Sequence, residues 1–568
     1  MEAQRVERGV SGRSRARRVL AIGALVTVAV GITQLAESDD VAAVTVASGR
    51  VDATNATASR WTSRTWTPTR TAHTTLRLSW PGTAMLHVEI RIAATRQWIA
   101  ANTTAVQPKT VAFAAQAGTP YRIAVWAETG AADFTVDDVT VSPPQTRPNI
   151  LLIISDDQRR DSIAALPNIR RWMADGGTTY TQGYVTTPSC CPSRAAILTG
   201  RYDHNNGVTS QKGPAFDEAT SFARYLDGAG YHTGHIGKYV HYYSLSARAP
   251  YWDRWTYWKG GYDNAVMNFD GVVRTSSGYS TTIAFDTAIG YVRDWEGSDA
   301  TPWMMQIAPT APHRQNNGPP PAEPKFASAT VPPWIYDPST FEADRSDKPS
   351  FLYCCSVTPQ EMSTTRTAMV RAMYSIDDGV NRLLTELAAK GELENTLVIY
   401  TSDNGWLFGD HGLHEKFVPY HNSVGVPLLV RWPGRVAAGV TDARFAANID
   451  LAPTMLAAAG IVPTTAMDGR DLLSSSLRPR RLTEYWQDSG NIAAIPDWAS
   501  LTTTTYQYTE YYEADHVTVR FREYYALTSD PYQLVNLFGD GNPANDPDVS
   551  TISAQLRADR TCRTTMCP

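Results

Sequence analysis

Residues 187–201 carry the strongest chemical pattern in the chain. They read Thr-Pro-Ser-Cys-Cys-Pro-Ser-Arg-Ala-Ala-Ile-Leu-Thr-Gly-Arg, with Cys190 just before the expected start of a helix. Pro192 suits a first helical turn and Gly200 suits a helix end, while the residues between them favour a helix. The Cys190 side chain therefore lies at the positive end of a helix dipole, beside the guanidinium of Arg194. This setting suits a group that meets an anion.

Two polar pairs follow two buried strands of the expected core. Asp156 and Asp157 come shortly after one apolar run, and Asp403 and Asn404 come shortly after another. Residues at the carboxyl ends of strands line the ligand site of open α/β sheets. Carboxylate and amide oxygens are hard ligands that suit Ca²⁺ or Mg²⁺ better than Zn²⁺. Each pair alone also fits a helix cap or a turn, so their combination with Cys190 is what indicates a cation beside a nucleophile.

The pattern Cys-x-Pro-Ser-Arg, followed by Leu-Thr-Gly-Arg, resembles the signature of the type I sulfatases. In that family the cysteine is oxidised to Cα-formylglycine, an aldehyde whose hydrate is the nucleophile, and the matching position is Cys190. The resemblance implies that Asp156, Asp157, Asp403 and Asn404 bind a cation, usually calcium, beside the formylglycine oxygen of residue 190. The alternative interpretation is that Cys190 and its neighbour are buried small residues or ligands of a different metal.

Three further polar residues match motifs of the same family. Lys238 follows a glycine after an expected strand, His313 ends an Ala-Pro-His motif, and Lys416 lies downstream of Asp403. By resemblance, the two lysines hold sulfate oxygens, and His313 holds or protonates the leaving oxygen. A lone lysine is usually solvated and a lone histidine usually packs in a core, but the spacing favours the site. Arg194 completes this set by lowering the cost of a charged nucleophile.

One position departs from the pattern of many arylsulfatases, which have a histidine two residues after this lysine. Here that position is Val240, and His241 comes one residue later. The form Gly-Lys-Tyr is more similar to the glucosamine-6-sulfatase and heparan-endosulfatase branch. Residues one apart on a strand point to opposite faces, so His241 need not replace the missing histidine, although we include it among the candidate catalytic residues.

Alternating strands and helices must position these motifs. Residues 149–154 are almost wholly apolar, as expected of a strand buried on both faces, and residues 368–389 have a clear helical period of apolar side chains. This alternation predicts an α/β domain over residues 146–480 with a doubly wound, mostly parallel sheet. The resemblance implies that this core is alkaline-phosphatase-like. Residues 481–568 predict a small antiparallel subdomain with a last helix near residues 552–557.

The N-terminal part has a different character. Residues 48–145 alternate between apolar and polar side chains with Gly and Pro between the runs, which predicts a β-sandwich accessory domain. Trp61, Trp66 and Trp98 could stack on a carbohydrate, although such residues more often pack in a core or at an edge.

Residues 1–47 combine a basic start with an uncharged apolar run. The run is shorter than the roughly 20 residues of a spanning helix. We therefore expect a cleaved export signal of the Sec or twin-arginine type, rather than an N-terminal anchor, and a secreted or cell-surface protein.

Composition excludes one class of partner and favours one cysteine pair. The formal net charge of -5 argues against a nucleic-acid binder. Of the 6 cysteines, Cys562 and Cys567 are separated by a comfortable local loop, so we expect them to pair in an exported protein.

These features together predict an exported sulfatase that cleaves sulfate monoesters of a sugar or an aryl alcohol. The resemblance implies that a formylglycine-generating enzyme modifies Cys190 during maturation. One alternative is a phosphonate monoester or phosphodiester hydrolase, because some relatives use the same aldehyde on phosphorus. Another is a carbohydrate-binding surface protein with an inactive core, against which the intact nucleophile and metal motifs count.

Overall fold

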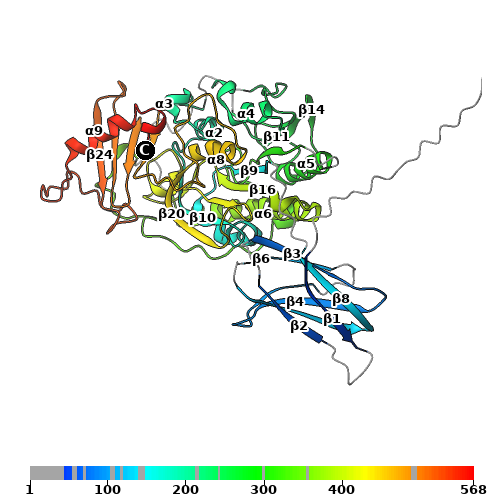
Figure 1. The fold of residues 1–568 in the computed structure, drawn as a ribbon. Helices are drawn as coiled ribbons and strands as arrows, with labels where there is room; N and C mark the ends of the chain where they lie inside the picture. The colour runs from blue at the N-terminus through cyan, green and yellow to red at the C-terminus, as the bar shows by residue number, and fades with distance from the viewer. Residues whose placement is uncertain are drawn as a thin grey trace, which may run out of the picture.

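A ten-stranded mixed sheet forms the centre of the computed structural model (Figure 1). Of these ten strands, β13 and β19 run against the direction that the others share. In spatial order the strands are β14 (Val272–Thr275), β13 (Val266–Phe269), β12 (Arg254–Tyr257), β11 (His232–Gly237), β15 (Trp303–Ala308), β9 (Asn149–Ser155), β16 (Thr396–Ser402), β19 (Leu428–Arg431), β10 (Thr178–Tyr184) and β20 (Val440–Ala447). The predicted α/β architecture with one large sheet is therefore confirmed.

The structure describes residues 44–53, 61–67, 72–102, 109–115, 119–138, 147–211, 216–240, 243–296, 301–352, 357–487 and 495–568. His241 and the predicted export signal lie outside these residues, apart from the last few positions of the latter, which begin β1. Within the described residues, none of the helices combines the length and apolarity needed to cross a membrane.

Helices cover both faces of the central sheet, and β9 shows why. Its residues Ile150, Leu152 and Ile154 pack into one buried cluster with α2 (Cys190–Thr199), α4 (Phe222–Gly228) and α8 (Leu451–Ala458). Leu151 and Ile153 point the other way, into a second cluster with α5 (Ser280–Trp295) and α6 (Pro359–Lys390). Because neighbouring strand residues face opposite sides, a strand between two helical layers must be apolar throughout. Figure 1 shows α2 and α4 on one side of β9 and α6 on the other.

Two helices begin earlier than the sequence predicts. Cys190 is the first residue of α2, whereas we expected the helix to start just after it; Gly200 ends α2 with a φ of 65°, as expected. The helix predicted over residues 368–389 begins at Pro359, where Thr358 and Glu361 form a capping box. The first turns of α6 are mostly polar, so the apolar period that reveals the rest of the helix is missing there.

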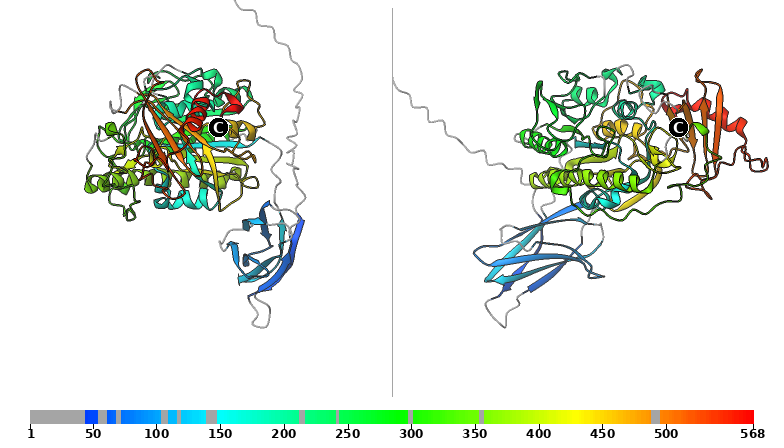
Figure 2. Two further views of the ribbon diagram at one scale, coloured as in Figure 1. Left: turned by 90° about the vertical axis from the view of Figure 1, so that its left-hand side faces the viewer. Right: turned by 180° about the vertical axis from the view of Figure 1, so that it is seen from behind.

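Two four-stranded antiparallel sheets make up the N-terminal region. One contains β1 (Val44–Asp52), β8 (Ala131–Asp138), β3 (Ala72–Ser79) and β6 (Lys109–Ala115); the other contains β2 (Trp61–Trp66), β7 (Tyr121–Thr129), β4 (Met85–Ile92) and β5 (Trp98–Asn102). Buried residues of both sheets, including Leu78, Val88 and Phe134, share one hydrophobic cluster. Figure 2 shows these strands as a unit beside the larger α/β body.

The C-terminal region forms a separate sheet. Its four antiparallel strands are β21 (Arg481–Tyr485), β22 (Trp498–Thr502), β23 (Gln507–Tyr512) and β24 (Val519–Tyr525), followed by α9 (Val549–Asp559). The predicted disulfide between Cys562 and Cys567 is present. The remaining α-helices and β-strands of the described residues are short: α1 (Pro167–Ile169), α3 (Asp203–Asn206), α7 (His421–Val424), β17 (Leu407–Phe408) and β18 (His414–Glu415).

Candidate active site

Cys190 stands at the N-terminus of α2, next to the carboxyl ends of the central strands. Its side chain is 2% exposed. The backbone turns into the helix at Ser189, which is extended, with a φ of -147°. Burial raises the pKa of the Cys190 thiol to about 12, so the unmodified thiol is a weak nucleophile near neutral pH. The helix dipole and nearby cations nevertheless favour negative charge at this position.

The two predicted polar pairs meet because their strands are neighbours. Parallel pairing of β9 with β16 ends at Ser155 and Ser402, so both pairs leave the same edge of the sheet. The backbone N–H of Asp157 donates to Oδ1 of Asp403 at 3.2 Å. Nδ2 of Asn404 donates to Oδ1 of Asp157 at 2.6 Å. Asp156, Asp157, Asp403 and Asn404 are all buried, so the structure brings four oxygen-bearing side chains into one cluster beside Cys190.

Three cationic side chains form ion pairs with these carboxylates. Lys238 places Nζ 2.5 Å from Oδ2 of Asp156, and Arg194 places Nε 2.8 Å from Oδ2 of Asp403. Lys416 pairs with Asp157, and its Nζ lies 2.9 Å from Sγ of Cys190. Burial alone would raise the pKa of Asp156, but the charges of Lys238, His313 and Arg194 hold it well below its usual range. The cluster therefore contains ionised carboxylates and charged cations in close contact.

A glycine fixes the position of Lys238. Gly237 ends β11 with a φ of 119°, a conformation that side chains rarely adopt. A Cβ atom at this residue would lie 2.1 Å from the carbonyl oxygen of Ala308 on the adjacent strand β15. The N–H of Lys238 donates to that same oxygen at 2.8 Å. The Gly-Lys motif thus has a steric reason, since the strand end must turn closely past β15 to aim the lysine at Asp156.

His313 lies at the margin of the cluster. Its Nε2 is 3.6 Å from Oδ2 of Asp157, and its Nδ1 is 2.6 Å from the carbonyl oxygen of Arg314. The His313 side chain is 35% exposed, whereas those of Lys238 and Lys416 are each 5% exposed. Of the predicted catalytic residues that the structure describes, His313 is therefore the one best placed to meet a group that enters from solvent.

The donor set fits a divalent cation. Asp156, Asp157, Cys190 and His313 each offer a ligand atom within 4.8 Å of the others. Oδ2 of Asp157 is buried without a hydrogen-bond partner. An ionised oxygen that is buried and unpartnered costs free energy unless a cation satisfies it. Two members of this set are carboxylates, whose oxygens are typical ligands of hard cations.

Arg159, which no sequence motif marks, joins the two loops of the site. Arg159 is buried and donates from Nη1 to both carboxylate oxygens of Asp410 at 3.0 and 2.9 Å. Its Nη2 donates to Asp337 at 2.9 Å. Arg159 thereby ties the loop that carries Asp157 to the loop that leads to Lys416. A lone arginine two residues after an acidic pair carries no recognisable signal, because its partners are distant in sequence.

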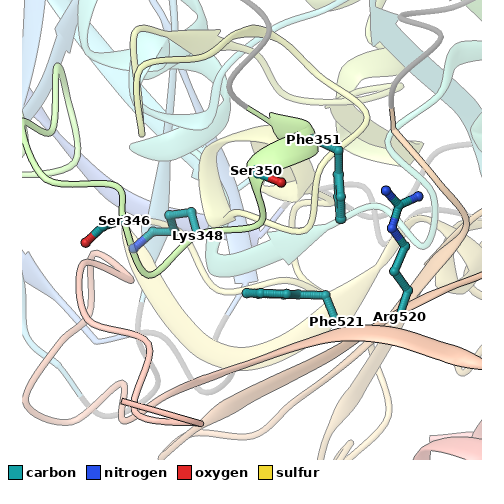
Figure 3. Close-up of a pocket in the computed structure, with 6 residues that line it drawn as sticks. All are labelled: Ser346, Lys348, Ser350, Phe351, Arg520 and Phe521. Atoms are coloured by element: carbon teal, nitrogen blue, oxygen red, sulfur yellow. The ribbon is translucent and has the colours of Figure 1, made fainter. Parts of the chain in front are cut away.

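A large cavity lies apart from this cluster. It has a volume of about 580 Å³ and is lined by Ser346, Lys348, Ser350, Phe351, Arg520 and Phe521. Figure 3 shows Arg520 rising from β24 beside the Phe351 ring, with the Arg520 guanidinium carbon 4.8 Å from the ring centre. None of the predicted site residues that the structure describes lines this cavity.

Several known proteins are similar to this chain in sequence. The chain is 33% identical to a Drosophila melanogaster protein named as an extracellular sulfatase SULF-1 homolog, over 61% of this chain and 33% of the relative. It is 30% identical to human N-acetylglucosamine-6-sulfatase, over 69% of this chain and 81% of that protein. The chain thus spans about a third of the first relative and most of the second.

Two solved structures share the fold at low sequence identity. One is described as a complex with its substrate D-glucosamine-2-N,6-O-disulfate; it has a TM-score of 0.61 and 23% identity and covers 72% of this chain and 96% of that chain. The other is a phosphonate monoester hydrolase from Silicibacter pomeroyi, with a TM-score of 0.57 and 20% identity over 73% of this chain and 95% of that chain.

Two family models match the chain. A model described as N-sulphoglucosamine sulphohydrolase, C-terminal, matches residues 409–560. The sulfatase model matches residues 148–461, more than half of the chain, and this stretch contains every predicted site residue. The chain belongs to the sulfatase family.

Proposed function

We propose that this protein hydrolyses sulfate monoesters, so that water enters and an alcohol and sulfate leave. The observation that carries the proposal is the position of Cys190. It stands at the N-terminus of a helix, with Lys416 at 2.9 Å and the carboxylate cluster directly beside it. Family membership supports the same conclusion. Cationic side chains next to a nucleophile position can stabilise a doubly charged leaving anion.

The nucleophile proposed here is a formylglycine made from Cys190 by a formylglycine-generating enzyme. When present, its hydrate supplies an oxygen nucleophile that the buried thiol does not. Arg194 holds its own place through Asp403 and through the carbonyl oxygen of Lys238, to which Nη1 donates at 2.7 Å. Its Nη2 is buried without a hydrogen-bond partner, 3.6 Å from Oδ2 of Asp156, and is thus available to stabilise negative charge beside residue 190.

We propose Ca²⁺, with Mg²⁺ as the alternative, as the resident cation. Asp156, Asp157, Asp403 and Asn404 would hold it, together with the modified side chain of residue 190. When bound, the cation supplies positive charge that polarises the sulfate oxygens and the nucleophile. Lys238 and Lys416 then need no longer neutralise the carboxylates and can turn their ammonium groups to sulfate oxygens.

His313 is proposed to protonate the leaving oxygen. Its ring is part-exposed and its Nδ1 is fixed by the carbonyl oxygen of Arg314, so Nδ1 carries the proton and Nε2 faces the site. A protonated Nε2 can donate to the leaving alcohol oxygen as the sulfur–oxygen bond breaks. His241 remains a candidate catalytic residue without a described position.

The proposed substrate is a sulfated sugar, and an aryl sulfate would serve as a convenient assay substrate. Several relatives are named N-acetylglucosamine-6-sulfatase, and one solved structure of the same fold is a complex with a sulfated glucosamine. The likeness of the Gly-Lys-Tyr form to that branch supports the same substrate class.

We propose that the chain divides into an export signal or anchor, a β-sandwich, the α/β core and the C-terminal subdomain, at the boundaries that the sequence predicts. The shared core of the two N-terminal sheets supports the sandwich. Trp66 packs on Phe113 and Tyr121, with ring centres 6.3 and 6.1 Å away, which favours a packing role for its ring. The side chains of Trp61 and Trp98 lie outside the described set. Relatives named extracellular sulfatases support export.

Replacement of Cys190 tests the proposal directly. The full chain is produced with a formylglycine-generating enzyme, and peptides that contain residue 190 are analysed by mass spectrometry. We expect an aldehyde at residue 190 and turnover of 4-nitrophenyl sulfate, both lost in Cys190→Ala. The control Cys191→Ala, at the adjacent position of α2, should retain the aldehyde and activity. Wild-type turnover in Cys190→Ala would refute the nucleophile.

Rates on matched esters separate the sulfatase from the phosphonate hydrolase, because the two share the fold. We expect faster hydrolysis of 4-nitrophenyl sulfate than of 4-nitrophenyl phenylphosphonate. The reverse order would make the phosphorus ester the substrate. If protein that carries the aldehyde hydrolyses neither ester, the carbohydrate-binding protein with an inactive core becomes the favoured alternative.

A further inference from the structure

A second cavity lies behind the loop that carries the catalytic carboxylates. It has a volume of about 300 Å³ and extends from Asp157 to the middle of α6 and to Trp334. Among the described site residues, Asp157 forms part of its wall, whereas Cys190, Lys238, His313 and Lys416 do not. The cavity therefore adjoins the active site without being the place where sulfate meets residue 190.

The inner wall of this cavity is apolar. Met369 and Met373, one helical turn apart on α6, are 1% and 3% exposed, and Phe408 of β17 is 5% exposed. Trp334 continues this wall toward the mouth, with its ring centre 5.6 Å from that of Phe408. A surface of methionine and aromatic side chains adapts to the shape of an apolar ligand and gains free energy from each buried carbon. The polar side chains of the lining are Asp157, Arg159, Asp161, Ser162 and Arg366. Of the charged ones, Asp157 pairs with Lys416, and Arg159 pairs with Asp161.

On α6, one cationic side chain interrupts the apolar wall. Arg366, on the same face of α6, donates from Nη1 to the carbonyl oxygen of Pro332 at 3.1 Å, and its guanidinium carbon lies 6.0 Å from the centre of the Trp334 ring. No carboxylate of the described residues lies within ion-pairing distance of Arg366. Burial is the largest influence on its pKa and lowers it, despite the opposing charge of Asp161. A half-buried guanidinium without a counter-ion is stabilised by an incoming acid.

Arg159, the other arginine of this cavity, differs from Arg366 because it already has counter-ions. Arg159 also lines the cavity, but Asp161, Asp337 and Asp410 pair with it at 3.1, 2.9 and 2.9 Å. Its charge is thus already neutralised inside the protein. Arg366 is left as the group in this cavity that can hold an anion from solvent.

We propose that this cavity binds an organic monoanion with an aromatic or alkyl body. The acid group pairs with Arg366 near the mouth, and the body lies against Met369, Met373 and Phe408. This binding requires neither the formylglycine nor hydrolysis, so it is a separate property from the proposed activity. Because Asp157 belongs to the same wall, bound ligand also stabilises the loop of the catalytic carboxylates.

The test uses the full chain as the Cys190→Ala variant, so that turnover plays no part. The probe is 4-propylbenzoate, titrated by calorimetry and by tryptophan fluorescence, and the matched neutral probe is 4-propylbenzyl alcohol. We expect the benzoate to bind about tenfold or more tightly than the alcohol, because a hydrogen bond to a charged group adds to the same apolar contact. Arg366→Gln should abolish this preference by weakening the benzoate alone.

Two further variants locate the site. Arg371→Gln changes another α6 arginine, which donates to the carbonyl oxygen of Ala329 at 3.0 Å outside the cavity, and should bind the benzoate like the parent. Lys238→Met removes a cation of the sulfate site and should also leave binding unchanged. The proposal is overturned if the benzoate shows no saturable binding, if the alcohol binds equally well, or if Lys238→Met rather than Arg366→Gln abolishes binding. Since turnover is not measured, failure of the proposed hydrolysis would leave these results unaffected.

Discussion

One largely buried histidine, His204, should make the stability of this protein depend on pH in a defined window. His204 lies in α3, just after the Cys190 helix, and its side chain is 12% exposed. Nδ1 lies 2.6 Å from Oε1 of Glu484, and Nε2 lies 3.1 Å from the carbonyl oxygen of Cys562. Burial alone would lower the pKa of His204, but the charge and hydrogen bond of Glu484 and the carbonyl of Cys562 raise it to about 9.

The magnitude follows from the difference between this value and the ordinary pKa of 6.5. A difference of one in pKa corresponds to 1.36 kcal/mol, so the proton on His204 stabilises the fold by ~3 kcal/mol. The folded state binds the proton more tightly than the unfolded state does. The stabilisation is therefore complete below about pH 6.5 and is lost as the pH rises through about 9.

Replacement of His204 by Gln removes the titrating group but keeps a hydrogen-bonding side chain. We expect this variant to be less stable than the wild type by ~3 kcal/mol at about pH 6, and nearly equal to it at about pH 10. Guanidinium unfolding followed by fluorescence at both pH values measures the difference, and groups that titrate in both proteins cancel.

His232→Gln is the matched control. His232 lies 3.8 Å from Asp253 and its side chain is 44% exposed, and such surface pairs contribute less than about 1 kcal/mol. This variant should follow the wild type at both pH values. A stability difference between wild type and His204→Gln that stays constant from about pH 6 to about pH 10 would refute the reasoning.

Three further substitutions test the site and its support. Gly237→Ala should lower kcat about a hundredfold, because the new Cβ would lie 2.1 Å from the Ala308 carbonyl oxygen and displace the following lysine; steady-state kinetics measures this. Gly379→Ala should lower the unfolding free energy by about 1 to 3 kcal/mol, because its Cβ would lie 2.2 Å from the Phe285 ring between two packed helices; thermal unfolding measures it. Added Ca²⁺ should raise the thermal midpoint of chelator-treated protein, and Asp403→Asn should reduce that rise, because the cation binds the folded state alone.

Each of these three predictions has a matched control substitution. Apart from adjacent residues and the backbone of its own helix, a Cβ added at Gly228 or Gly290 would have no atom within 4 Å. Gly228→Ala should therefore keep kcat, and Gly290→Ala should keep the thermal midpoint. Asp263→Asn removes a carboxylate outside the proposed cation ligands and should leave the calcium effect intact. Unchanged kcat in Gly237→Ala, an unchanged midpoint in Gly379→Ala, or a full calcium effect in Asp403→Asn would contradict the corresponding prediction.

Local sequence predicts much of the fold because several elements have strong local signals. The wholly apolar run of β9 and the apolar period of α6 identify both elements, and the disulfide of Cys562 with Cys567 follows from a short loop. The start of α6 at Pro359 is missed because its first turns are polar. A capping box at Thr358 marks this start, but the hydrophobic period does not.

The aromatic residues show where sequence is ambiguous. The aromatic-rich segment of Trp252, Trp255 and Trp258 could stack on a sugar, although its sequence favours packing, and the structure buries all three. Trp66 is likewise held by Phe113 and Tyr121. A tryptophan has the same local sequence signal in both roles, because the choice depends on which distant strand lies beside it.

The sequence by itself determines the groups of the site: a cysteine at a helix start, two polar pairs at strand ends, two lysines and a histidine. Their types and local spacing are properties of short segments. Only the tertiary structure decides that Lys238, Arg194 and Lys416 meet three carboxylates from two strands, and that Arg159 joins the two loops. It also decides that Arg366 forms no ion pair with any described residue in a cavity beside Asp157. These contacts join residues far apart in the chain, so sheet order and helix packing fix them, and no local propensity encodes them.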